Sequence, residues 1–223
     1  MIKDFLQITF TNRYKTVETR PFKVMSFIKF FVVFTLVVFG ILYLITSIMG
    51  PFPKRGGGFA EMSVLLGFFM YIIRYPLLEE LVFRLWLKPG KYNHYISIAC
   101  CLASLLYVWI RYGLNDYSFF VCSYAVIMAV ILINKFTSGK DNNHFRLWMY
   151  ISAMLFGFVH ISNYADFLSI DIWKYPLLVF PQLCLGLAAA YIRLRYGFKY
   201  SVLLHSVNNF IPWIIFVLFA ANR

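Results

Sequence analysis

The chain has 223 residues, of which 61% are hydrophobic and 13% are charged, whereas a soluble domain has about 45–50% apolar and about 25% charged residues. This composition excludes a soluble globular protein, because too few charged side chains are present to cover its surface. Lys and Arg number 21 against 9 Asp and Glu, a net charge of +12. In a membrane protein, such an excess of cations is typical of the cytoplasmic segments.

Seven apolar stretches follow one another along the chain, each close to the roughly 20 residues that a helix needs to cross a bilayer. They lie at residues 28–49, 62–87, 95–112, 117–134, 146–162, 176–192 and 200–220. The second stretch contains Pro76, and we expect a kink or tilt there. The sequence therefore predicts an all-α polytopic transmembrane helical bundle of about seven spanning helices. Residues 1–27 are expected to form a basic cytoplasmic segment and residues 28–223 the integral membrane domain.

The distribution of cations predicts the orientation of the bundle. If the N-terminus lies inside, 15 of the 21 Lys and Arg fall in inner segments, five fall in outer segments, and Arg74 lies within a span. This bias favours an N-inside, C-outside topology with an odd number of crossings. We expect an integral membrane protein, in the plasma (inner) membrane if the host is a prokaryote.

Ionisable side chains inside a span cost roughly 2.5–3.5 kcal/mol on insertion scales, so they are candidate functional residues. The first group is Glu79, Glu80 and Arg84 in the second stretch. Glu80 and Arg84 are four residues apart and can form an ion pair on one face of a helix. Glu79 points about 100° away from Glu80 and is left to face another element. The alternative is that the ion pair only locks the helix, while Glu79 turns to the inner interface.

The second and third groups contain histidines. His160 ends the fifth stretch, and His205 and Asn209 lie four residues apart in the last stretch, so that they share a helical face. Two such donors could hold an oxyanion in a cavity of low dielectric constant. For each group taken alone, the alternative is a structural contact, such as a polar clamp between helices. Together the three groups supply a base, a second acid, a fixed cation and two imidazoles, which is enough for water-mediated hydrolysis if the helices converge.

These motifs carry a family resemblance. E-E-x-x-x-R at 79–84, F-x-x-x-H at 156–160 and H-x-x-x-N at 205–209 resemble, in this order, those of the CAAX protease and bacteriocin-processing (CPBP) family, also called the ABI family. That family includes the type II CAAX prenyl endopeptidases, and the resemblance covers about residues 66–210. It implies an intramembrane glutamate-type endopeptidase. The site residues that it implies are Glu79 and His160 to activate water, Glu80 held by Arg84 to orient the site, and His205 and Asn209 to stabilise the oxyanion.

The sequence departs from the family pattern at two points. Leu85 stands where many members have a glycine, and about 75 residues separate the first two motifs, a distance that suggests an inserted helical pair within 95–134. The expected helix ends also place His160 toward the outer side and Glu79 toward the inner side. These two residues meet only if their helices are tilted, kinked or longer than expected.

Three alternatives stay open at this point. One Glu and two His form a known catalytic zinc set, but the chain lacks H-E-x-x-H, so we expect catalysis without a metal or other cofactor, with zinc as the alternative. An immunity or partner-binding protein of the same fold would keep the bundle without the reaction. A transporter would show internal repeats or paired broken helices, and the sequence indicates neither. The expected partners are the lipid bilayer and a membrane-associated peptide or lipidated protein, prenylated or bacteriocin-related, and not a nucleic acid.

Overall fold

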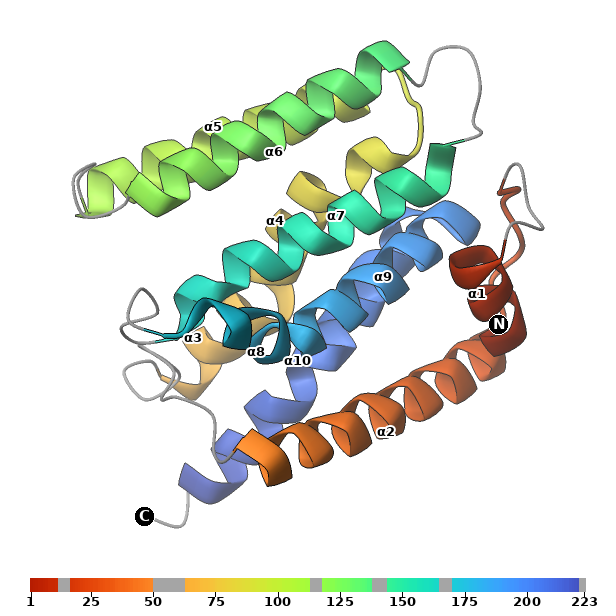
Figure 1. Cartoon of the computed structure of the whole chain (residues 1–223), viewed down its shortest axis with the longest axis vertical. Helices are drawn as coiled ribbons and strands as arrows, with labels where there is room; N and C mark the ends of the chain where they lie inside the picture. The colour runs from red at the N-terminus through yellow and green to blue at the C-terminus, as the bar shows by residue number, and fades with distance from the viewer. Residues whose placement is uncertain (12–16, 50–62, 113–117, 138–143, 165–169, 221–223) are drawn as a thin grey trace.

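The computed structural model describes residues 1–11, 17–49, 63–112, 118–137, 144–164 and 170–220, and its regular elements are helices (Figure 1). In chain order they are α1 (Ile2–Phe10), α2 (Val24–Met49), α3 (Val64–Phe68), the π-helix η2 (Phe69–Arg74), α4 (Tyr75–Phe83), η3 (Leu85–Leu87), α5 (Asn93–Tyr112), α6 (Ser118–Thr137), α7 (Phe145–Val159), η6 (His160–Asn163), η8 (Ile172–Lys174), α8 (Tyr175–Leu178), α9 (Phe180–Arg195) and α10 (Phe198–Ala220). The all-α prediction is confirmed.

Five helices of the described chain are long and apolar enough to cross a membrane. They are Val24–Ser47, Asn93–Ile110, Ser118–Thr137, Phe145–Asn163 and Phe198–Leu218. A sixth candidate is the pair Ile172–Leu178 and Phe180–Arg195, which is bent by 49°. The expected second span is divided into α3, η2 and α4. The chain is therefore an integral membrane protein by the length and composition of its helices, while the count of about seven and the N-inside orientation stay predictions.

The division of the second span has a local cause at Pro76. Proline has no backbone N–H and cannot continue the hydrogen-bond ladder, but it fits the first turn of a helix, and Pro76 lies in the first turn of α4. The π-helix η2 ends immediately before α4, and the N–H of Tyr75 donates to Met70 O, five residues back. The carbonyl of Tyr71 instead accepts a hydrogen bond from Asn209 Nδ2 at 3.1 Å. The expected kink thus takes the form of a π-helix that binds a side chain of α10.

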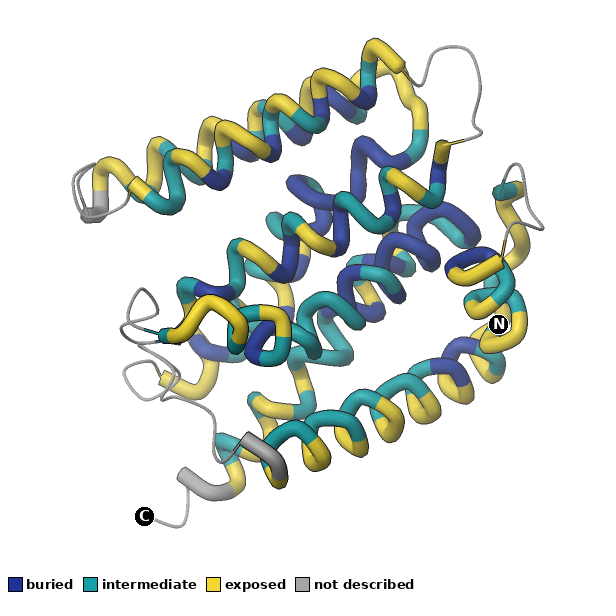
Figure 2. The backbone as a smooth tube through the Cα atoms, viewed as in Figure 1, coloured by how far each residue is buried: buried dark blue, intermediate teal, exposed yellow. Residues whose placement is uncertain are grey.

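The helices form three layers (Figure 1). The pair α5 and α6 lies on one side and α2 on the other, with α4, α7, α9 and α10 between them. Buried residues concentrate in the C-terminal half of α9, whereas α2 exposes much of its length (Figure 2). The predicted inserted pair is thus a peripheral layer, linked to α4 by a hydrogen bond of 2.7 Å from Ser97 Oγ to Leu81 O.

Small residues allow α7 and α9 to approach closely. A Cβ atom on Gly186 would lie 2.9 Å from Ala153 Cα, and one on Gly157 would lie 2.6 Å from Leu183 Cδ2. Close backbone approach at glycine and alanine is a common way to pack helices in membranes. It brings the end of α7, which His160 follows directly, against α9.

Candidate active site

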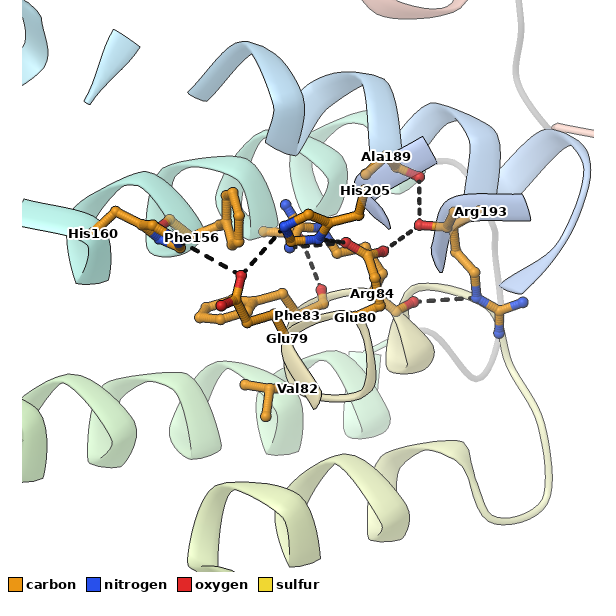
Figure 3. Close-up of polar contacts among 12 residues, drawn as sticks. Glu79, Glu80, Val82, Phe83, Arg84, Phe156, His160, Ala189, Arg193 and His205 are labelled. Carbon is orange, nitrogen blue, oxygen red and sulfur yellow. Dashed lines mark hydrogen bonds and ion pairs between the residues drawn. The ribbon is translucent and has the colours of Figure 1, made fainter. Parts of the chain in front are cut away.

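The glutamates of α4 have different environments, as their 100° separation predicts. Glu80 is completely buried, and its Oε1 lies 3.4 Å from Arg84 Nη1 and 3.0 Å from His205 Nδ1 (Figure 3). Ser201 Oγ donates a hydrogen bond to Glu80 Oε2. A carboxylate in an apolar interior is tolerated when it is paired and hydrogen-bonded in this way. The predicted Glu80–Arg84 ion pair is present, and α10 supplies two further partners.

Glu79 points to the other two helices that the motifs select. Its Oε2 lies 3.6 Å from His160 Nε2 and 3.4 Å from His205 Nε2 (Figure 3). The Glu79 side chain is 28% exposed and that of His160 is 16% exposed, in contrast to the buried Glu80. Glu79 is therefore the accessible carboxylate of the pair, and it does not turn away from the bundle.

His160 reaches Glu79 because α7 ends at Val159 and the chain tightens into the 3-10 turn η6. Its Nδ1 lies 2.7 Å from Phe156 O. A carbonyl only accepts hydrogen bonds, so Nδ1 carries the proton and, in the neutral ring, Nε2 is an acceptor. The sequence placed the two residues toward opposite sides, and the structure joins them through the broken second span and this tight turn.

The contacts of His205 also determine which of its ring nitrogens carries the proton. Its Nδ1 faces the carboxylate of Glu80, so Nδ1 is the donor and Nε2 is the acceptor in the neutral ring. Two imidazole nitrogens and Glu79 Oε2 then converge as three acceptors. Such an arrangement is stable only if a proton or a hydrogen-bond donor such as water is shared among them. The site can therefore hold and move protons at one carboxylate oxygen.

Arg84 is held by charge and by aromatic contact more than by hydrogen bonds. Its guanidinium is completely buried, and its Cζ lies 4.0 Å from the centroid of the Phe156 ring. Within the described part of the chain, Nε, Nη1 and Nη2 have no hydrogen-bond partner. A Cβ on Gly186 would lie 3.1 Å from Arg84 Nη2, so this glycine leaves the space that the guanidinium occupies. The phenylalanine of the F-x-x-x-H motif thus provides a cation–π contact.

Three polar side chains of the site region were not singled out as site residues from the sequence. Besides Ser201, Arg193 donates to Arg84 O at 3.2 Å and to Leu85 O at 2.9 Å, and Ser152 donates to Phe83 O at 2.6 Å. Arg193 and Ser152 thus donate to carbonyls where α4 ends and η3 begins, a point at which the hydrogen-bond ladder of the α-helix stops. Ser201 could have been found, because it lies four residues before His205 and hence on the same face of α10.

Asn209 lies one turn beyond His205, and its amide donates to Tyr71 O and not to either glutamate. Of the six site residues expected from the sequence, the structure brings five into one cluster: Glu79, Glu80, Arg84, His160 and His205. Asn209 lies beside them, at the adjoining π-helix. Among the described residues, no group of three or more His, Cys, Asp or Glu is arranged to hold a metal ion.

The fold and the site together define the class of protein. It is a helical membrane protein with a cluster of carboxylates and imidazoles between its helices. Residues 61–211 match the family model described as Type II CAAX prenyl endopeptidase Rce1-like. The chain belongs to this family, which is a family of membrane proteases. Comparisons with curated proteins and with solved structures gave no match.

Proposed function

We propose that this protein is an intramembrane endopeptidase in which Glu79 and His160 activate the attacking water. The observation that carries the proposal is Glu79 Oε2, a buried atom of a side chain that is 28% exposed, with an imidazole Nε2 at 3.6 Å and another at 3.4 Å. A water bound there has a carboxylate and an imidazole to accept its two protons. Glu79 takes one proton as the water oxygen attacks the peptide carbonyl, and the same proton then goes to the leaving amine. The reaction consumes one water and releases an acid and an amine.

In the proposed reaction, the remaining residues orient the site and stabilise charge. Glu80, paired with Arg84, holds the Nδ1–H of His205 and favours a proton on Nε2, which can then donate to the oxyanion. Asn209 has two amide protons, of which one is given to Tyr71 O. The second is available for the same oxyanion.

We infer that the substrate is a membrane-associated peptide, with a prenylated C-terminal CAAX-type sequence as the first choice and a bacteriocin-related peptide as the second. Support comes from the family match and from the position of the polar cluster among apolar helices. A soluble peptide would have to leave water to reach Glu79, whereas a lipid-anchored peptide is already concentrated at the membrane.

The test is cleavage of a fluorogenic farnesylated CAAX peptide by the purified protein, with the same peptide lacking the farnesyl group as substrate control. Glu79→Gln keeps the volume of the side chain and removes the base, so a fall in kcat of roughly 10²–10⁴-fold is expected. Wild-type rates in a folded Glu79→Gln protein would exclude the mechanism. Loss of activity with a chelator, restored by Zn²⁺, would favour the zinc alternative. Tight binding without cleavage would favour a partner-binding protein.

A further inference from the structure

A cavity of about 300 Å³ lies apart from the glutamate–histidine cluster, between the start of α2 and the end of α9. Its lining residues are Met1, Arg20, Pro21, Lys23, Ser26 and Tyr196. Two of them are basic and none is acidic. The cavity therefore has the charge and the hydroxyl donors that suit an anion.

Asp4, whose carboxylate contacts Arg20, is already neutralised by another arginine. Asp4 Oδ1 and Oδ2 each accept a hydrogen bond of 2.9 Å from Arg195, and Oδ2 also accepts one of 3.0 Å from Tyr191. Arg20 lies farther from the same carboxylate, at 3.7 Å, and its side chain is 55% exposed. Arg20 and the exposed Lys23 thus keep an excess of positive charge at the cavity.

The first turn of α2 adds to this charge. Phe27 N donates to Lys23 O, so the N–H groups of the residues between them have no acceptor within the helix. The positive end of a helix dipole and its unpaired N–H groups favour a bound phosphate. Ser26, which lies in this turn, lines the cavity.

The helix beside the cavity exposes an apolar stripe. Ile2, Leu6 and Phe10 of α1 are spaced by four residues and are 36%, 49% and 63% exposed. The other face of α1 carries the buried Ile8 and the partly buried Phe5, whose ring centroid lies 5.4 Å from that of Phe30 in α2. A helix with this pattern, next to the first turn of a spanning helix, is typical of the membrane interface.

We propose that this cavity binds the phosphate group of an anionic phospholipid, with the stripe of α1 against the acyl chains. The lipid belongs to the leaflet that α2 enters at Val24. Charge complementarity and the contact of α1 with the spanning helix α2 both favour a lipid over a free anion. A bound lipid would bridge residues 20–26 and Tyr196, and so stabilise the contact of the start of α2 with the end of α9. The proposal is independent of the peptidase activity.

The experiment is native mass spectrometry of the detergent-solubilised protein, titrated with phosphatidylglycerol or phosphatidylcholine. Phosphatidylglycerol is expected to bind at least tenfold more tightly. The variant R20Q/K23Q should weaken this binding by about thirtyfold, at roughly fivefold for each cation near an anionic lipid surface. K91Q/K135Q removes the same charge at residues that do not line the cavity, and it should bind like wild type.

Two further experiments distinguish a bound phospholipid from other ligands of the cavity. Inorganic phosphate at millimolar concentration should not displace phosphatidylglycerol, and L6S/F10S should weaken lipid binding while Arg20 and Lys23 are kept. Equal binding of the two lipids by wild-type protein, or an equal loss in both double variants, would overturn the proposal. So would complete displacement by inorganic phosphate, which would indicate a site for free anions. If R20Q/K23Q does not fold, the single variants R20Q and K23Q, each expected to weaken phosphatidylglycerol binding by about fivefold, decide the question.

Discussion

His205 Nδ1 lies 3.0 Å from Glu80 Oε1, so a completely buried carboxylate orients an imidazole whose other nitrogen faces Glu79. The two adjacent glutamates therefore act on one ring from two sides. Glu80 is the buried, orienting partner within the bundle, and Glu79 is the more exposed carboxylate of the pair. This relationship makes the residues around Glu80 the sharpest targets for mutation.

Ser201→Ala should lower kcat by about tenfold with little change in KM. The substitution removes a hydrogen bond to Glu80 Oε2, and loss of a bond to a charged group costs about 1.5–3 kcal/mol. Steady-state kinetics over a range of pH would measure the change in kcat. The pH profile should also shift, because Glu80 would be held by one hydrogen bond fewer. Ser201→Thr keeps the hydroxyl and should restore most of the rate. An unchanged rate and profile in the alanine variant would show that Ser201 is only structural.

Glu80→Gln should destabilise the protein by about 3–5 kcal/mol, because it leaves the buried guanidinium of Arg84 without its counter-ion. The double variant Glu80→Gln, Arg84→Met removes both charges and should recover part of this loss. Thermal unfolding in detergent, followed by circular dichroism, measures both variants. If the double variant is less stable than Glu80→Gln alone, the guanidinium is held by Phe156 and not by charge.

Gly186→Ala should destabilise the bundle by roughly 1–3 kcal/mol. The added methyl group would lie 2.9 Å from Ala153 Cα and 3.1 Å from Arg84 Nη2, so helices α7 and α9 must separate. Gly40→Ala in α2 is the matched control, since a Cβ there meets nothing within 4 Å and alanine favours a helix. The same unfolding assay should show a loss for Gly186→Ala and no loss for Gly40→Ala. Equal effects would mean that the α7–α9 contact is not tight at Gly186.

Asn209→Ala should cost about 1–3 kcal/mol by leaving the carbonyl of Tyr71 without its hydrogen bond. Pro76→Ala provides a new backbone N–H at the π-helix, so Asn209→Ala should be milder in that background. A double-mutant cycle on unfolding free energies measures this coupling. Additive effects, with no coupling, would rule out Pro76 as the reason that Tyr71 O needs a side-chain donor.

Local features were predictable from the sequence because helix geometry alone sets them. The apolar stretches specify an all-α membrane protein, and the spacing of four residues pairs Glu80 with Arg84 and places Ser201, His205 and Asn209 on one face of α10. The same geometry separates Glu79 from Glu80. None of these relationships requires knowledge of how distant helices pack.

The meeting of Glu79 with His160 and His205 was decided by tertiary structure. It depends on a π-helix before Pro76, on a 3-10 turn at His160 and on the close approach of α7 to α9 at Gly157 and Gly186. The break at Pro76 was expected from the sequence, but the approach of α7 to α9 is set by packing between segments far apart in the sequence, and the same holds for the hydrogen bonds that Arg193 and Ser152 give to the end of α4. The sequence by itself determined which polar residues enter the membrane. Packing determined which of them touch, because contacts between helices depend on how the helices cross, which no local spacing encodes.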